Sequence, residues 1–329
     1  MDQSPFDLVK KQVLAVVVLL ALALPSFAQE EDSVEHYLFS YFTGNGEDGL
    51  HLAYSTDGMT WRALNSGASF LEPRVGEDKL MRDPSIVQGP DGIFHMVWTV
   101  SWEEKGIGYA SSKDLVHWSE QQYIPVMEHE LEALNSWAPE LFYDEQTDRF
   151  VIVWATTIPG RFPETDGQDG KKYNHRLYAV TTRDFSSFSD TELFYDHGFN
   201  VIDGAIFREQ KPYVMVLKDE TNKPFPVQKN IRLAFSDQAE GPWSEPTVPI
   251  TGDYWAEGPT ALKIDGSWHI YFDKYRQDQY GVVVSKDLED WDDRSEELKV
   301  PEAMRHGTAF RVSEEVMERL LKFSGEQKP

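Results

Sequence analysis

Apolar and polar residues alternate along many short segments of the chain, with the period of two that is typical of half-buried β-strands. Four such segments, DGIFHMVWT, TDRFVIVWAT, QKPYVMVLK and DGSWHIYF, each begin at a turn. The dipeptides Asp91-Gly92 and Asp265-Gly266 favour tight β-hairpins. A helical period appears only near the C-terminus, where Ser313 is a suitable N-cap for a short helix over 314–321. The pattern therefore predicts an all-β protein.

Two linked patterns occur five times each along the chain. The first is a strand that ends in Ser/Thr-x-Asp before an aromatic residue, at 52–61, 109–118, 178–188, 233–243 and 282–291. The second is a short strand with a polar or charged start, at 82–87, 137–142, 202–207, 256–263 and 306–312. Copies lie about 50 to 70 residues apart, which is near the length of one propeller blade. We therefore expect a five-bladed β-propeller, and five ordered copies disfavour the alternative of a β-sandwich with chance repeats.

The fifth copy, HGTAFRV at 306–312, has no alternating strand after it. The N-terminal segment HYLFSYF at 36–42 supplies one. We expect these two segments to pair, so that the last blade is built from both chain termini. Such a blade closes the ring and removes free sheet edges.

The first 28 residues have the features of a secretory signal peptide. Lys10 and Lys11 precede an apolar run over 13–24, and Ser26-Phe27-Ala28 is suitable for cleavage. The run is short for a membrane span, although an uncleaved N-terminal anchor is the alternative. We expect a periplasmic or secreted protein whose mature chain, 29–329, is a single catalytic propeller domain. The chain has no cysteine and hence no disulfide.

Composition narrows the classes of partner. The net charge of −25 repels nucleic acid and anionic membranes and disfavours polyanionic substrates. The 10 Trp, 14 Tyr and 19 Phe suit stacking on sugar rings, and they equally suit packing in a large β-protein. The sequence has no phosphate-binding Gly-rich loop, no His-Glu-x-x-His and no Gly-x-Ser-x-Gly. These absences give no indication of a required cofactor or of serine-hydrolase chemistry.

Candidate chemistry lies at the starts of the five first strands, because these strands line the axis of a propeller and their first residues converge. Three starts carry a carboxylate, at Asp83, Asp203 and Glu257, and the other two carry Trp137 and His306. A glycosidase needs one carboxylate to activate water and one carboxylic acid to protonate the leaving oxygen. A third carboxylate near the acid raises its pKa by repulsion. Each of the three also has a purely structural interpretation, as a turn residue, a backbone-bonded Asp or a surface acid.

The segments RDPSI, WAPEL, IDGAIF, EGPTALK with the following DGSWHIYF, and HGTAF resemble glycoside hydrolase family 43, in this order and over nearly the whole mature chain. The resemblance implies a five-bladed propeller that inverts the anomeric carbon. It implies that Asp83 is the general base, Asp203 the pKa modulator and Glu257 the general acid. Gly204 follows Asp203 where the family commonly has proline, which is a departure from the family's pattern.

Further residues are candidates for substrate binding. Trp137 is suited to stack on a sugar ring, and Asn135, Arg161 and Arg276 to orient hydroxyl groups. Arg161 belongs to a polar insertion at 159–173. The resemblance places His306 in the substrate site and near a central calcium ion or water cluster, as a metal contact made through water.

The function expected from this resemblance is exo-acting hydrolysis that removes arabinofuranosyl or similar residues from plant-type polysaccharides. A β-xylosidase and a galactan- or galactofuranose-cleaving hydrolase are alternatives. A glycoside phosphorylase would need a basic cluster at the strand starts, which the sequence lacks. A non-catalytic sugar-binding propeller is the alternative from another class, and in it the three carboxylates need not converge.

Overall fold

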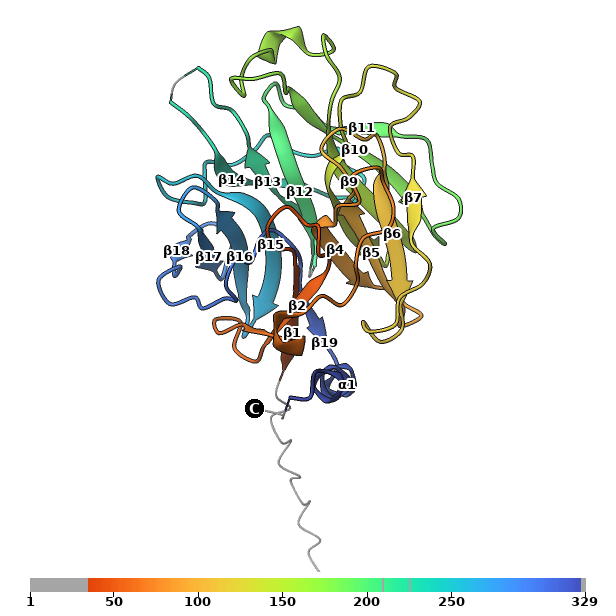
Figure 1. The fold of residues 1–329 in the computed structure, drawn as a ribbon. Coiled ribbons are helices and arrows are strands. Elements are labelled where there is room, and N and C mark those ends of the chain that lie inside the picture. The colour runs from red at the N-terminus through yellow and green to blue at the C-terminus, as the bar shows by residue number, and fades with distance from the viewer. Residues whose placement is uncertain (1–34, 209, 225, 327–329) are drawn as a thin grey trace, which may run out of the picture. The chain divides into compact units, whose positions relative to one another are not determined.

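The computed structural model describes residues 35–208, 210–224 and 226–326 (Figure 1). The signal-peptide prediction for residues 1–28 lies outside the described residues. Within the described part of the chain, no helix is long and apolar enough to cross a membrane.

Five antiparallel sheets form the five blades of a β-propeller, as the repeats predict. Blade 1 comprises β4 (Arg82–Gln88), β5 (Phe94–Thr99), β6 (Ile107–Ser112) and β7 (Gln122–Ile124). Blade 2 comprises β8 (Trp137–Asp144), β9 (Arg149–Thr157), β10 (His175–Thr182) and β11 (Glu192–Tyr195). Blade 3 comprises β12 (Val201–Phe207), β13 (Tyr213–Asp219) and β14 (Asn230–Ser236). Blade 4 comprises β15 (Glu257–Ile264), β16 (Ser267–Lys274), β17 (Gln279–Ser285) and β18 (Asp292–Asp293).

Blade 5 joins the two ends of the described chain. Its strand order is β19 (Ala309–Val312), β1 (His36–Tyr41), β2 (His51–Ser55) and β3 (Arg62–Ala63). Strands β19 and β1 are antiparallel, with Ala309 opposite Phe39 and Val312 opposite His36 (Figure 1). The pairing expected between the two distant segments is thus present, and backbone hydrogen bonds close the ring of blades.

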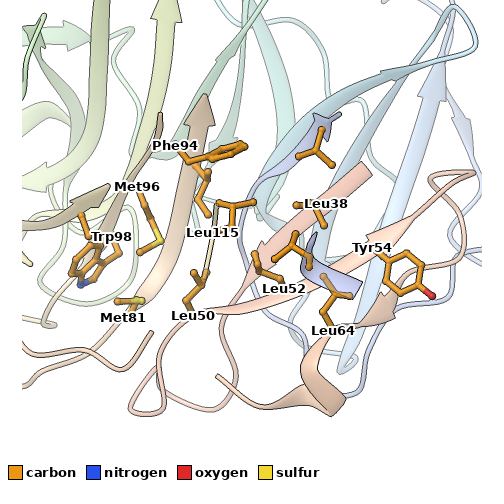
Figure 2. Close-up of a cluster of buried hydrophobic side chains, with 14 of the residues drawn as sticks. Leu38, Leu50, Leu52, Tyr54, Leu64, Met81, Phe94, Met96, Trp98 and Leu115 are labelled. Atoms are coloured by element: carbon orange, nitrogen blue, oxygen red, sulfur yellow. The ribbon is translucent and has the colours of Figure 1, made fainter. Parts of the chain in front are cut away.

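Hydrophobic contacts between neighbouring blades form the core. One cluster joins Leu38 and Leu52 of blade 5 to Met96 and Trp98 of blade 1 (Figure 2). The helix α1 (Glu314–Ser324) buries Met317, Leu320 and Leu321 in the same cluster. It begins as expected, since the Ser313 hydroxyl accepts the Val316 N–H, and it runs three residues beyond the predicted end. Two short 3₁₀ turns complete the elements, Asn65–Gly67 and Pro163–Thr165.

The repeated Ser/Thr-x-Asp pattern builds the turn after the third strand of a blade. In the first copy, the Asp57 carboxylate accepts the N–H groups of Met59 and Thr60 at 2.8 and 2.7 Å. Asp114, Asp184 and Asp287 accept the equivalent pairs of N–H groups in three other copies. These aspartates therefore shape turns in the blades.

The first strands of blades 1 to 4 share one irregularity that positions the site. In blade 1 the pairing shifts from Arg82 opposite Thr99 to Ser85 opposite Val97, which leaves one extra residue in β4. Strands β8, β12 and β15 shift at the same place. The bulged residue has positive φ in each strand: Asp83 (52°), Ala138 (47°), Asp203 (54°) and Gly258 (59°). Positive φ is uncommon for residues other than glycine, and bulges beside active sites redirect side chains.

Candidate active site

A cavity of about 840 Å³ lies where the first strands begin. Asp83 from β4, Asp203 from β12 and Glu257 from β15 all line it, together with His306 from the segment before β19. The cavity therefore brings together candidate residues that are distant in the sequence, with 223 positions between Asp83 and His306.

Asp83 is buried and held in an ionised state. Its Oδ2 accepts a hydrogen bond from the Thr99 hydroxyl at 2.9 Å, and its Oδ1 lies 3.3 Å from His306 Nδ1. Burial alone would raise the pKa of Asp83, but the hydrogen bond and charge of His306 hold it below the ordinary 3.8. A carboxylate that stays charged at neutral pH is suited to accept a proton from water.

His306 is the buried centre of this cluster. Its second ring nitrogen, Nε2, lies 3.0 Å from Glu140 Oε1, and the Ser85 hydroxyl donates to the other Glu140 oxygen at 2.8 Å. Burial opposes the charged imidazolium, yet the two carboxylates raise the pKa of His306 well above 6.5. A Cβ atom at Gly258 would lie 2.3 Å from His306 Cγ, so only glycine allows the ring this position.

Asp203 is buried at the bulge of β12. Its Oδ2 accepts the N–H of Gly258 at 2.9 Å. Burial, assisted by the negative charge of Glu257, raises the pKa of Asp203 to about 7, against the opposing effects of His306 and Lys218. Asp203 is therefore largely protonated below pH 7. Packing explains why a glycine follows Asp203, because a Cβ at Gly204 would lie 2.4 Å from Leu177 Cδ1.

Glu257 is partly exposed to the cavity and contacts a cation on each oxygen. Lys218 Nζ lies 2.9 Å from Oε2, and Arg305 Nη2 lies 3.3 Å from Oε1. Arg305 also binds Asp273, a buried carboxyl whose pKa rises to about 6 mainly through burial. Glu257 thus combines access to the cavity with a fixed position.

The other predicted binding residues divide into two groups. Trp137 and Arg276 line the cavity beside the residues above. The Trp137 indole N–H donates to the Trp102 carbonyl at 2.9 Å, and the Tyr173 ring packs on it with centroids 4.7 Å apart. The guanidinium of Arg276 lies 4.9 Å from the centroid of the Trp255 ring.

Asn135 and Arg161 do not line the cavity, so the structure does not bring them together with the other predicted substrate-binding residues. Asn135 is fully buried. Its Oδ1 accepts a hydrogen bond from the Thr157 N–H at 3.1 Å, which pairs the last backbone N–H of β9. Both terminal nitrogens of Arg161 bind the carboxylate of Glu130 at 2.9 Å. The insertion at 159–173 still reaches the site through its last residues, since Asp169, Lys171 and Tyr173 line the cavity.

His306 does not have the geometry of a metal ligand. Both of its ring nitrogens face carboxylates, and the raised pKa keeps both protonated. No group of three or more His, Cys, Asp or Glu in the described part of the chain is arranged to hold a metal ion. The residues present therefore do not fit a calcium ion coordinated directly by His306, and the contact through water stays a prediction.

The sequence interpretation missed four charged residues of the site: Glu140, Lys218, Asp273 and Arg305. A detectable signal existed for one of them. Aligning the four bulged strands puts Ser85, Glu140, Ala205 and Thr260 at one position, and a glutamate among small residues is conspicuous there. Lys218 and Asp273 come from second strands, so only the pairing of strands reveals them.

Comparison with known proteins supports a glycosidase fold. Residues 32–318 match a family model described as a probable glycosyl hydrolase domain. No curated protein matches the sequence. A thermostable family-43 glycoside hydrolase has 16% identity and a TM-score of 0.51, over 65% of this chain and 71% of that one. An α-L-arabinofuranosidase from Lactobacillus brevis has 19% identity and a TM-score of 0.51, over 65% and 72%. An exo-β-1,3-galactanase from Phanerochaete chrysosporium has 12% identity and a TM-score of 0.51, over 73% and 53%.

Proposed function

The chain belongs to the glycosyl hydrolases related to family 43, and from this premise we propose that it hydrolyses glycosidic bonds with inversion, with Asp83 as general base and Glu257 as general acid. The observation that carries the proposal is the convergence of Asp83, Asp203 and Glu257 on one cavity in contrasting environments. Asp83 is stabilised as an anion, whereas Asp203 keeps its proton up to about pH 7. Carboxyls whose environments separate their pKa values are typical of acid–base sites.

The proposed reaction is a single displacement. The Asp83 carboxylate takes a proton from water, and the water oxygen bonds to the anomeric carbon. Glu257 gives its proton to the glycosidic oxygen, which leaves with the electron pair of the broken carbon–oxygen bond. His306 holds Asp83 in place and favours its charged form, while Asp203 binds the N–H that follows Glu257. Inversion requires the two carboxyls to be about 6.5 to 9.5 Å apart, which leaves room for the water.

For the substrate, we propose a non-reducing terminal α-L-arabinofuranosyl group on a plant-type polysaccharide. The support is the set of motifs RDPSI, WAPEL and HGTAF, together with aromatic side chains at the cavity that suit a sugar ring. Trp102, Trp137 and Tyr173 line one part of it, and Trp255 and Tyr275 another. β-Xylosides and galactans are the other substrates to test.

The test is a panel of nitrophenyl glycosides with arabinan, xylan and arabinogalactan, with products resolved by chromatography. Proton NMR of the first turnover gives the anomeric configuration, and the proposal expects the inverted sugar. Asp83→Asn should lose activity on every substrate that the wild type cleaves. Binding of these sugars without turnover would instead support the sugar-binding propeller.

We also propose that the protein is exported and processed. The support is the charged, apolar and small-residue order of residues 1–28. Mass spectrometry of the protein recovered outside the cytoplasm should give a chain that begins at Gln29. Retention of residues 1–28 on a membrane-bound protein would favour the uncleaved anchor.

A further inference from the structure

In each bulged first strand, the last paired residue before the bulge lies opposite one residue of the second strand of its blade. These facing residues are Thr99, Ala155, Lys218 and Asp273. Thr99 donates a hydrogen bond to Asp83, and Asp273 binds the Arg305 that contacts Glu257. Lys218 contacts Glu257 directly. In three of the four blades, this second-strand residue therefore contacts a candidate catalytic carboxyl, either directly or through Arg305.

Lys218 is a buried lysine with two carboxylate partners. Its Nζ lies 2.9 Å from Glu257 Oε2 and 2.6 Å from Glu220 Oε2. The Tyr275 ring lies on another side, with its centroid 4.7 Å from Nζ. Burial would lower the pKa of Lys218, but Glu220 and Glu257 hold it well above the ordinary 10.5.

Glu220 keeps Lys218 charged whatever the protonation state of Glu257. The Glu220 carboxylate binds both Lys218 and Lys229, and their charges hold its pKa below the ordinary 4.5 despite burial. When Glu257 carries a proton, Lys218 still has an ionised partner. Lys218 is thus a fixed positive charge beside a group that gains and loses a proton in the proposed reaction.

Resting on the proposed function, we propose that Lys218 is a positioning residue for the general acid. It holds Glu257 at the cavity and stabilises the carboxylate that remains after the Glu257 proton has passed to the glycosidic oxygen. Negative charge on Glu257 grows as its O–H bond breaks, so the attraction to Lys218 strengthens toward the transition state. Interactions that strengthen in this way raise the rate of the chemical step.

Lys218 acts among several other groups that face Glu257. One of them is cationic, Arg305, and the remainder are acidic: Asp203, Asp273 and Tyr275. Loss of Lys218 leaves Arg305 as the sole cation within 4 Å of Glu257 among the described residues. Glu257 should then hold its proton to higher pH.

The kinetic test compares Lys218→Met, which keeps the length and removes the charge, with Lys218→Arg, which keeps the charge. On aryl glycosides with poor leaving groups, Lys218→Met should lose about 10- to 100-fold in kcat/KM, part of the 10² to 10⁴ that general acids contribute. On the dinitrophenyl glycoside of the same sugar the loss should be much smaller. The alkaline limb of the pH profile should move up by about one pH unit. Lys218→Arg should recover most of the activity.

Lys229→Met is the matched control. Lys229 also binds Glu220, but it forms no ion pair with Glu257 among the described residues. The control variant should leave the ratio between the two leaving groups unchanged. Equal losses by Lys218→Met on both substrates, or the same change of ratio in Lys229→Met, would show that Lys218 only supports the fold.

A titration separates this inference from the proposed function. In protein labelled with ¹³C at the Glu carboxyls, Glu257→Gln identifies the Glu257 signal. Its titration midpoint should be about one pH unit higher in Lys218→Met than in the wild type. An unchanged midpoint overturns the inference even when the wild type cleaves glycosides. If the midpoint changes but the wild type cleaves no glycoside, the effect of Lys218 on Glu257 stands and the proposed function is refuted.

Discussion

Replacing Asp203 by asparagine should raise the stability of the protein relative to the wild type, by an amount that grows between about pH 4 and pH 8 and is constant above this range. The pKa of Asp203 rises from the ordinary 3.8 to about 7 in the folded protein, chiefly because of burial. One pKa unit corresponds to about 1.4 kcal/mol, so ionising this carboxyl costs the folded state roughly 4 kcal/mol relative to the unfolded chain. The substituted side chain would keep an oxygen for the Gly258 N–H and carry no charge.

The sign follows from proton binding. A group with a raised pKa in the folded state contributes stability that is complete below pH 3.8 and lost as pH rises through about 7. Between pH 5 and pH 8, the wild type should lose about 2.5 kcal/mol of unfolding free energy through Asp203 alone. Asp203→Asn does not suffer this loss, and titrating groups that do not interact with Asp203 cancel in the comparison.

Urea denaturation of both proteins at pH 5, 6, 7 and 8 measures the difference. Asp184→Asn is the control, because backbone N–H groups from Ser186 and Ser187 lower the pKa of Asp184 to about 2, outside this range. The difference between this control and the wild type should be constant from pH 5 to 8. A constant difference for Asp203→Asn as well would refute the assignment of a protonated Asp203.

Two further outcomes follow from the site. Glu257→Gln should lose about 10² to 10⁴-fold on substrates with poor leaving groups and far less on dinitrophenyl glycosides, whereas Asp83→Asn should lose activity on both, as steady-state kinetics would show. Gly258→Ala should lose about 2 to 5 kcal/mol of unfolding free energy in urea, because its φ of 59° is strained for alanine and the new Cβ meets the His306 ring. Gly266→Ala, with φ of 76° and no heavy atom within 4 Å of its Cβ, should lose only the backbone part, about 1 to 2 kcal/mol.

The fold could be predicted because its signals are local. Alternating strands, Asp-Gly turns and the Ser/Thr-x-Asp turns each depend on a few neighbouring residues. Closure by the chain ends followed from one missing strand in the fifth repeat, and the pairing of Phe39 with Ala309 agrees with it. The convergence of Asp83, Asp203 and Glu257 followed from the same repeats, because equivalent residues of a propeller meet near its axis.

Side-chain direction was not predictable in the same way. Asn135 lies just before the WAPEL strand, but it turns inward to satisfy the backbone of β9. Arg161 lies in the insertion and binds Glu130, an acid of another loop. Sequence distance from a motif therefore does not show whether a long polar side chain faces the cavity or a neighbouring loop.

The division of charge within the site depends on contacts between blades, which no single repeat contains. The sequence interpretation expected Asp203 to raise the pKa of the acid by repulsion. In the structure, burial, with repulsion from Glu257 as a smaller cause, raises the pKa of Asp203 itself, while Glu257 is partly exposed between Lys218 and Arg305. These two cations come from blade 3 and from the segment before blade 5, so their approach to Glu257 of blade 4 requires the closed ring. The strand pairing of β1 with β19 is thus a condition for the electrostatics of the site as well as for the fold.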